Sequence, residues 1–309
     1  MEPIKGITFQ PFGRRGTLAA PEARENLKRM RERTGATHVV LAPSGIQKTP
    51  QSETIVFDGP GTYADSELCE MIRFAQSIGL RVILKPTVNC ANGVWRAFIN
   101  FFDEDVPGEP CWANWFESHT RFMTHYAALA QKTGCVLFIA GCEMVMAQRR
   151  EAQWRALIAR VREEYGGPVS YNTDKYQEDR VAWWDCVDVI SSSGYYPLGG
   201  WEPQLDRIEE VVRRFGKPFF FAETGCMSAQ GAGAVPNDWT RSTPPDPAEQ
   251  ERWYREMFAH TARRPWVSGY ALWDWPERRY APEEAARDSG YGIYAKPAEA
   301  AVREFYTGG

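Results

Sequence analysis

Eight short apolar runs recur along the chain, and most lack the regular alternation of polar and apolar residues that marks a strand with one exposed face. Runs of this kind are typical of strands that are buried on both faces, as in a parallel sheet. The predicted strands occupy residues 6–10, 37–42, 81–87, 135–143, 168–172, 187–193, 218–223 and 267–273.

Helices are predicted between these runs, because apolar residues there recur every three or four positions. In residues 66–78 the apolar stripe consists of Leu68, Ile72, Ala75 and Ile78, and Gly79 ends the helix. A shorter helical segment is expected between the fifth and sixth strands. The other predicted helices occupy residues 22–33, 115–131, 151–164, 203–214, 248–262 and 297–305.

This alternation of strands and helices predicts a (β/α)8 TIM barrel of the α/β class, with right-handed crossovers. A chain of 309 residues is long enough for that fold. No Pro/Ser-rich linker interrupts the pattern, so we expect a single catalytic domain over residues 1–309.

The charge and hydropathy of the chain narrow its possible partners. The net charge of −4 implies no basic face, so we do not expect nucleic acid as a partner. No apolar run is long enough to span a membrane, and the first residues do not resemble a signal peptide. We therefore expect no membrane association and a cytoplasmic location, or secretion if a signal was trimmed. The oligomeric state stays open.

The cysteines and histidines do not indicate a metal or thiol enzyme. The seven cysteines include no Cys-x-x-Cys pair, which is typical of reduced thiols in the cytosol. The four histidines form neither a His-x-His nor a His-Glu-x-x-His pattern, so we expect no catalytic zinc site. Cys90, Cys142 and Cys226 lie at strand ends, but none has a neighbouring histidine in the sequence, which disfavours a nucleophilic cysteine.

Two of the predicted strands end in a glutamate, Glu143 and Glu223. In a barrel the carboxyl ends of all strands meet at the catalytic face. Two carboxyl groups about 5–5.5 Å apart cleave a glycosidic bond with retention, one as acid/base and the other as nucleophile. The alternative for Glu223 is a structural carboxylate paired with an arginine. Glu143 allows the same alternative, and its strand could slip by one residue toward Met144.

Further polar and aromatic residues follow the strand ends and could bind a sugar. Tyr195 or Tyr196 could donate a hydrogen bond to Glu223, and Trp273 could stack on a sugar ring. Core packing is the alternative for these aromatic residues, and a solvated loop is the alternative for the residues after strand three. Asn172 could donate a hydrogen bond from behind the site to a residue that contacts the sugar. The candidates are Lys85, Asn89, Trp95 and Arg96 after strand three, Asn172 after strand five, Tyr195 and Tyr196 after strand six, and Trp273 at the end of strand eight.

The chain is rich in aromatic residues, with 12 Trp, 13 Tyr and 16 Phe, which permits a carbohydrate site. Residues 231–247 are rich in Gly and Pro and too long for a simple connection, so we predict an active-site loop there. Whether this loop and residues 89–111 block one end of the cleft would decide between endo and exo action.

At these residues the chain resembles the clan A glycoside hydrolases, and more closely glycoside hydrolase family 113, the β-mannanase family. The matching segments run in order from strand three to strand eight and are fairly specific as a series. They are Leu84-Lys-Pro, Asn92-Gly-x-Trp-Arg96, Trp115-Phe116 with His125-Tyr-Ala, Gly141-Cys-Glu-Met144, Val187-Asp-Val-Ile with Tyr195-Tyr-Pro-Leu198, Ala222-Glu-Thr-Gly225, and Trp273.

The resemblance implies that Glu143 is the acid/base and Glu223 the nucleophile of a retaining hydrolase, without a metal or organic cofactor. It implies a carbohydrate substrate containing β-1,4-linked mannose. Two other classes stay open: a retaining hydrolase of another β-linked sugar, such as a β-glucoside or β-xyloside, and a non-catalytic sugar-binding barrel.

The chain departs from the family pattern at three positions. The clan usually has Asn directly before the acid/base, where it holds the sugar 2-hydroxyl, and this chain has Cys142. The family tends to carry His after its Lys-Pro and an aromatic residue after its Trp-Phe-x-x, and this chain has Thr87 and His119. We expect these three residues near the sugar that is cleaved, where they bear on mannose specificity.

Overall fold

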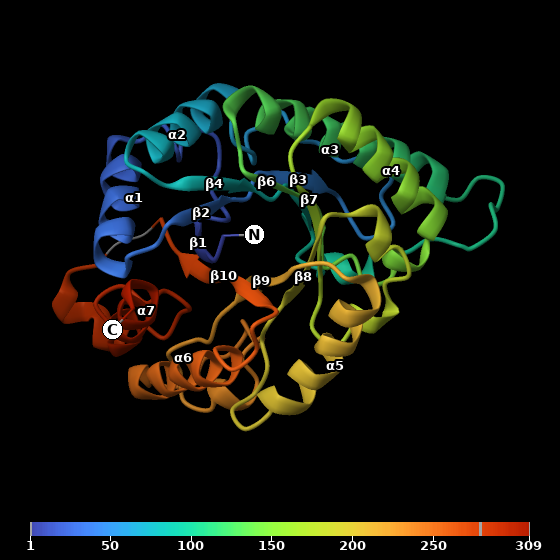
Figure 1. Cartoon of the computed structure of the whole chain (residues 1–309). Helices are drawn as coiled ribbons and strands as arrows, with labels where there is room; N and C mark the ends of the chain where they lie inside the picture. The colour runs from blue at the N-terminus through green and yellow to red at the C-terminus, as the bar shows by residue number, and fades with distance from the viewer. Residues whose placement is uncertain (1, 278–279, 309) are drawn as a thin grey trace.

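The computed structural model describes residues 2–277 and 280–308, which form a closed barrel of parallel strands surrounded by helices (Figure 1). This confirms the predicted (β/α)8 class. Around the barrel the strands follow the order β1-β10-β9-β8-β7-β6-β4-β2. Their bounds are β1 (Ile4–Phe9), β2 (His38–Leu41), β4 (Arg81–Leu84), β6 (Leu137–Cys142), β7 (Val169–Thr173), β8 (Val189–Ser193), β9 (Phe219–Thr224) and β10 (Val267–Trp275).

The helices form an outer ring around the strands (Figure 1). No helix within residues 2–277 and 280–308 is both long and apolar enough to cross a membrane. The α-helices are α1 (Pro21–Thr34), α2 (Asp65–Ser77), α3 (Trp112–Thr133), α4 (Glu151–Glu164), α5 (Trp201–Phe215), α6 (Pro247–Thr261) and α7 (Pro297–Thr307).

The core has two layers, which explains why the strands are apolar at nearly every position. Phe220 and Ala222 of β9 belong to a cluster inside the barrel. Phe219 and Phe221 of the same strand belong to the larger cluster between the barrel and the helices, where Phe221 lies edge-on to Trp201 of α5. Because successive side chains of a strand point to opposite faces, a strand between two apolar layers needs apolar residues throughout.

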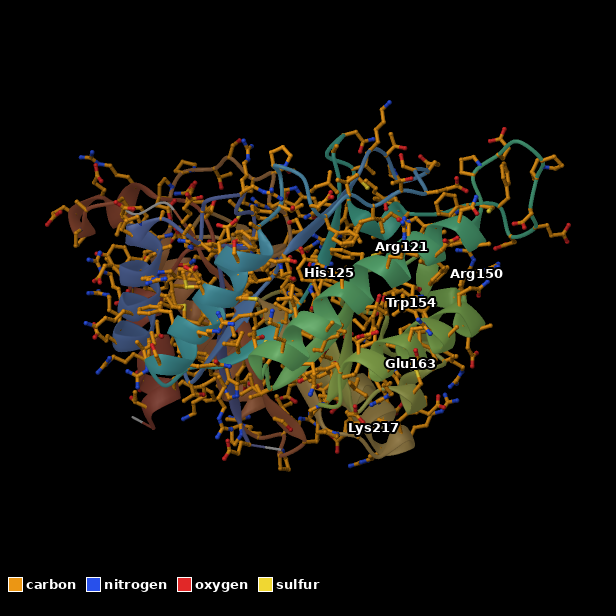
Figure 2. All side chains as sticks on the ribbon, turned by 90° about the horizontal axis from the view of Figure 1, so that it is seen from above. Arg121, His125, Arg150, Trp154, Glu163 and Lys217 are labelled. Atoms are coloured by element: carbon orange, nitrogen blue, oxygen red, sulfur yellow. The ribbon has the colours of Figure 1, made fainter. Side chains whose placement is uncertain are left out.

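In the connection between β7 and β8, two buried tryptophans take the place in the core that a long helix fills elsewhere around the barrel. Within the described residues this connection contains two short 3-10 segments, Glu178–Arg180 and Trp184–Cys186, in agreement with the predicted shorter helical segment. Trp183 and Trp184 are fully buried. The Trp183 ring stacks on Trp154 of α4 at 4.9 Å between centroids, and its Nε1 donates to the Gln148 carbonyl at 2.9 Å. Figure 2 shows α4 from Arg150 past Trp154 to Glu163.

The second and third barrel strands continue beyond the rim as a separate pair, β3 (Ser44–Gln47) and β5 (Thr87–Cys90). The two pairs keep one register, with Leu41 opposite Leu84 and Ser44 opposite Thr87. Pro43 and Pro86 lie between the pairs, and proline has no backbone N–H to donate to a ladder. The single predicted strand over residues 81–87 is therefore two strands, β4 and β5.

We expect Trp183→Ala to lower the free energy of unfolding by about 3–5 kcal/mol, because it empties a fully buried site and leaves the Gln148 carbonyl unpaired. Urea denaturation followed by circular dichroism measures this. The matched control is Trp239→Ala, since Trp239 is 57% exposed. An equal loss of stability in both variants would contradict the packing role of Trp183.

Candidate active site

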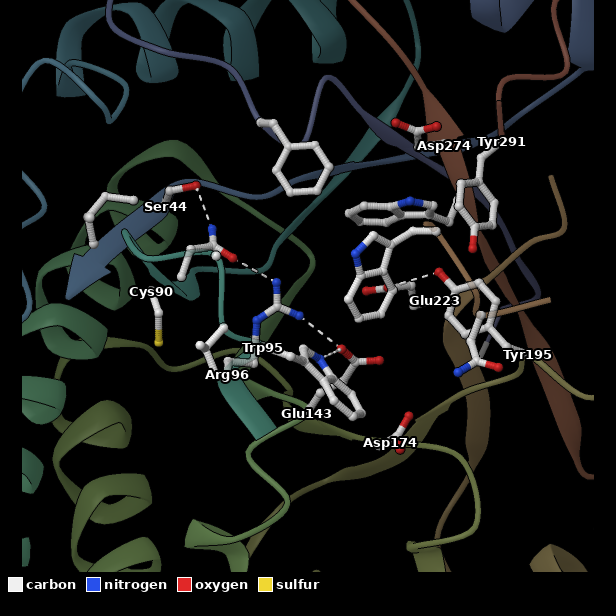
Figure 3. A pocket seen from close by; sticks show the side chains of 18 of the residues that line it. Ser44, Cys90, Trp95, Arg96, Glu143, Asp174, Tyr195, Glu223, Asp274 and Tyr291 are labelled. Carbon is white, nitrogen blue, oxygen red and sulfur yellow. Dashed lines mark hydrogen bonds and ion pairs between the residues drawn. The ribbon is translucent and has the colours of Figure 1, made fainter. Parts of the chain in front are cut away.

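A cavity of about 660 Å³ opens at the carboxyl ends of the barrel strands (Figure 3). Glu143 and Glu223 both line it, so the two strand ends deliver the two glutamates to one site. Trp95, Arg96, Tyr195 and Trp273 line the same cavity.

A β-bulge turns Glu223 into the cavity. Ser192 and Ser193 of β8 pair with Phe221 and Glu223, so β9 carries one extra residue at Ala222. Without the bulge, strict alternation would place Glu223 on the same face as Phe221, toward the helices. A bulge re-aims the side chains that follow it. Gly225 then permits close packing, because a Cβ atom there would lie 2.3 Å from the Trp273 carbonyl oxygen.

A second bulge positions Glu143. Ile139 and Cys142 of β6 pair with Ser170 and Asn172, two residues apart on β7, so β6 also carries an extra residue. Gly141 in this bulge has a φ of +152°, and a Cβ atom there would lie 2.9 Å from Trp154. Glu143 itself has a φ of +54°, in the left-handed region. Non-glycine residues in this region are uncommon and cluster at functional sites.

Glu223 lies among donors that stabilise its charge. The Lys85 Nζ donates to Oε2 at 2.8 Å, and the Tyr195 hydroxyl donates to Oε1 at 2.8 Å. Both partners are buried. Burial alone would raise the pKa of Glu223, but Lys85, Arg96 and these hydrogen bonds outweigh it and lower the pKa below its ordinary value. Glu223 is therefore an ionised carboxylate at neutral pH.

Glu143 has the opposite balance. Its Oε2 accepts from the Arg96 Nη1 at 2.9 Å and from the Trp95 Nε1 at 3.1 Å, and its Oε1 accepts from the Ser193 hydroxyl at 2.8 Å. Burial and the nearby Glu223 raise the pKa of Glu143 above its ordinary value, although Arg96, Ser193 and Trp95 oppose the shift. The environments thus separate the pKa values of the two carboxyls, as expected for an acid and a base in one site.

Cys142 lies close to Glu223 and to Arg96, the partner of Glu143. Its Sγ is 3.8 Å from the Glu223 Oε2 and 4.0 Å from the Arg96 Nη1. Burial raises the pKa of this thiol well above its ordinary value. A thiol that stays protonated is a poor nucleophile, so Cys142 serves as a small neutral neighbour of Glu223.

Aromatic residues form the rim of the cavity. Trp239, from the predicted loop of residues 231–247, lies edge-on to Trp95 at 6.1 Å between ring centroids. Phe12 lies edge-on to Trp273 at 5.6 Å. Trp239 and Phe12 are 57% and 66% exposed, although both line the cavity. Exposed aromatic rings at the mouth of a cavity indicate a surface that binds a ligand.

Three of the predicted binding residues do not reach the cavity. Lys85 lies fully buried behind Glu223 and pairs with that carboxylate, so it cannot bind sugar hydroxyls directly. Asn172 donates to the Ser193 hydroxyl at 3.0 Å and so supports Glu143 from behind. The Tyr196 hydroxyl points away from the site and donates to Glu178 at 2.7 Å. Both tyrosines were expected in the site, but adjacent residues point in different directions and only the Tyr195 hydroxyl reaches Glu223.

None of the three departures from the family pattern lines the cavity, since Cys142, Thr87 and His119 are all buried outside its wall. The Thr87 hydroxyl donates to the Lys85 carbonyl at 3.0 Å. His119 was expected near the cleaved sugar, but it is buried on α3 with its ring 4.6 Å from that of Trp115. Burial lowers the pKa of His119 to about 3, so it is neutral. The expectation for His119 was wrong because this part of α3 packs against α4.

Other residues of the site did not stand out in the sequence. Ser193 ends β8 and Asp174 follows β7. Their position as polar residues at the ends of buried strands is the sequence signal by which they could have been found. Asn89 was expected and does line the cavity, where it accepts from the Arg96 Nη2 at 2.8 Å. Tyr291 lines it from a loop without any pattern.

Among the described residues, no three His, Cys, Asp or Glu side chains are grouped so that they could hold a metal ion.

The comparisons with known proteins agree with this geometry. The sequence profile of Glycoside Hydrolase Family 113 matches residues 7–296. The chain belongs to this family. No curated protein matches the sequence.

Three solved structures of the family resemble this member over its whole length. Two are described as a "GH113 beta-1,4-mannanase", one of them as a complex, and each is 50% identical with a TM-score of 0.98 and 99% of both chains covered. The third is the GH113 β-mannanase AaManA from Alicyclobacillus acidocaldarius in complex with ManMIm. It is 42% identical with a TM-score of 0.96, and the match covers 100% of this chain and 98% of AaManA.

We expect Lys85→Met to lower the free energy of unfolding by about 3–5 kcal/mol at pH 7, because it leaves the buried Glu223 charge without its partner. The double variant Lys85→Met/Glu223→Gln removes both charges and should recover most of that loss. Urea denaturation of the two variants and the wild type measures the difference. A double variant that is less stable than Lys85→Met would contradict the pairing.

Proposed function

We propose that this protein hydrolyses β-1,4-linkages in mannose-containing oligosaccharides or polysaccharides, with retention of configuration. The observation that carries the proposal is the pair of buried carboxyls in one cavity, with the pKa of Glu223 lowered and that of Glu143 raised. The substrate class is supported by a family member named as a β-1,4-mannanase at 50% identity and one named as a β-mannanase at 42% identity.

In the first step, Glu223 attacks the anomeric carbon and the bond to the leaving oxygen breaks, while Glu143 gives that oxygen its proton. The sugar is then an ester of Glu223. In the second step, Glu143 takes a proton from water, which attacks the same carbon and releases Glu223. Lys85 and Tyr195 stabilise the carboxylate before attack and after release.

The hydrogen bonds of Glu143 identify the oxygen that carries its proton. Oε2 accepts two N–H groups, from Arg96 and Trp95, so it has no place for a proton. Oε1 accepts one hydrogen bond, from the Ser193 hydroxyl, so it keeps a lone pair that can carry the proton. Oε1 is therefore the atom that delivers the proton to the leaving oxygen.

The aromatic walls of the cavity position the sugar rings. Trp273 lies over the Lys85 Nζ at 5.5 Å from its ring centroid, which holds the indole in place. Trp95 is held by its hydrogen bond to Glu143. Sugar rings would stack on these two indoles, so that binding also orients the bond to be cleaved.

The primary test compares wild type, Glu143→Ala and Glu223→Ala on β-1,4-manno-oligosaccharides, with products separated by chromatography. We expect cleavage by the wild type, loss of about 10²–10⁴-fold in rate for Glu143→Ala and no turnover for Glu223→Ala.

An aryl β-mannoside with a good leaving group separates the two roles, because its departure needs no proton. Glu143→Ala should then release aryl alcohol in a burst, followed by slow hydrolysis of the ester, and Glu223→Ala should give no burst. Cleavage of glucosides or xylosides but not mannosides by the wild type would overturn the substrate class and leave the two-step chemistry standing.

A pH profile tests the electrostatics of Glu223. Because the Tyr195 hydroxyl stabilises the ionised carboxylate, Tyr195→Phe should raise the pKa of Glu223 and move the acidic limb of kcat/KM to higher pH. Tyr196→Phe is the matched control, since its hydroxyl bonds to Glu178 outside the cavity. An acidic limb that moves equally in both variants would count against this role of Tyr195.

A further inference from the structure

Asp174 is a nearly buried carboxyl that faces the cavity and that the two-step reaction does not use. It is 8% exposed and follows β7 directly. It lines the cavity, on the side of Glu143 (Figure 3). A polar group in this setting needs partners, because burying it without hydrogen bonds is costly.

The backbone explains why Asp174 lies beside Glu143. The Glu143 N–H donates to the Asn172 carbonyl at 2.7 Å, so the end of β7 runs alongside the Glu143 backbone. Asp174 comes two residues after Asn172. Glu223 lies farther around the barrel on β9, with β8 between β7 and β9.

Asp174 has unused hydrogen-bonding capacity. Its carboxyl accepts from the backbone N–H of Lys175, and no side chain in the described part of the chain donates to it. The neighbouring buried acid Glu178 differs, since its Oε1 accepts from Ser192 and Tyr196 and its Oε2 pairs with Arg207 at 2.6 Å. Glu178 is thus satisfied within the protein, whereas Asp174 presents its carboxyl to the cavity.

The charges around Asp174 favour its neutral form. Burial and the facing carboxyl of Glu143 raise the pKa of Asp174 to about 8, with a smaller contribution from Glu178, while Lys175 opposes the shift. Glu143 in turn is faced by Glu223 and Arg96. Below that pH the side chain is a carboxylic acid with one donor and an acceptor oxygen. Sugar hydroxyls both donate and accept, so a neutral acid can bind two of them.

We propose that Asp174 binds the hydroxyl groups of the first sugar of the leaving group and thereby selects for a sugar, rather than another alcohol, at that position. The inference rests on the proposed function, in which Glu143 protonates the leaving oxygen. That oxygen must lie within hydrogen-bonding distance of Glu143. The sugar that departs with it therefore begins beside Glu143, where Asp174 faces the cavity.

The test compares two substrates that differ in their leaving group, a β-1,4-manno-oligosaccharide and an aryl β-mannoside, at pH 6. For Asp174→Ala we expect kcat/KM on the oligosaccharide, relative to the aryl mannoside, to fall by about threefold to tenfold, the effect of one or two hydrogen bonds. Asp174→Asn should restore most of this ratio, because an amide also offers a donor and an acceptor.

A charge control and a folding control complete the design. Asp206→Asn removes one acidic group from the outer helix α5, where Arg264 keeps Glu202 and Glu209 as partners, and should leave the ratio unchanged. Thermal melting of every variant verifies folding.

An equal loss on both substrates in Asp174→Ala would overturn the inference, because it would mean that Asp174 acts through Glu143 and not on the leaving sugar. No change on either substrate would also overturn it. Both outcomes leave the proposed function intact, whereas a wild type that cleaves neither mannoside overturns the function itself and the inference with it.

Discussion

The ion pair between Lys85 and Glu223 is the interaction on which the site depends. Both groups lie almost wholly out of water, and two carboxyls share the same cavity. Like charges at close range cannot both be stable there, so one of them must hold a proton. The lysine decides which one: it makes Glu223 the ionised member and leaves Glu143 as the acid, although both residues lie at the carboxyl ends of buried, largely apolar strands.

The backbone conformation around these carboxyls is as important for the site as their charges, because it directs both side chains into the cavity. Both glutamates follow a β-bulge, and Glu143 also adopts a left-handed conformation. A closed barrel can tolerate such irregularities at one end because the helices and the apolar layers fix the rest of each strand. The rigid part of the fold therefore holds two locally irregular segments opposite each other, and the chemistry depends on their relative placement.

Much of this could be predicted from the sequence because it follows from periodicity. The barrel, the two glutamates and Tyr195 were all visible as strand ends. The directions of individual side chains could not be predicted, because each bulge shifts the alternation along its strand by one residue and no sequence pattern indicates where the bulges lie. Nor does the sequence show which polar group faces the cavity: Lys85 was expected to bind sugar but lies behind Glu223, and Tyr196 turns to Glu178. Tyr291 and Phe12 come from loops whose course depends on tertiary contacts, so no local signal could identify them.

The paired prolines at the rim have a consequence for how such an enzyme can diversify. Pro43 and Pro86 separate the barrel strands from β3 and β5, which carry Ser44, Ile46, Asn89 and Cys90 into the cavity wall. The outer pair is a short sheet with its own hydrogen bonds, so its side chains can be exchanged without disturbing the barrel ladder below. Asn89 is tied to Glu143 through Arg96, whereas Ile46 is not, so Ile46 is the position of this segment at which the cleft can evolve, or be redesigned, apart from the catalytic carboxyls.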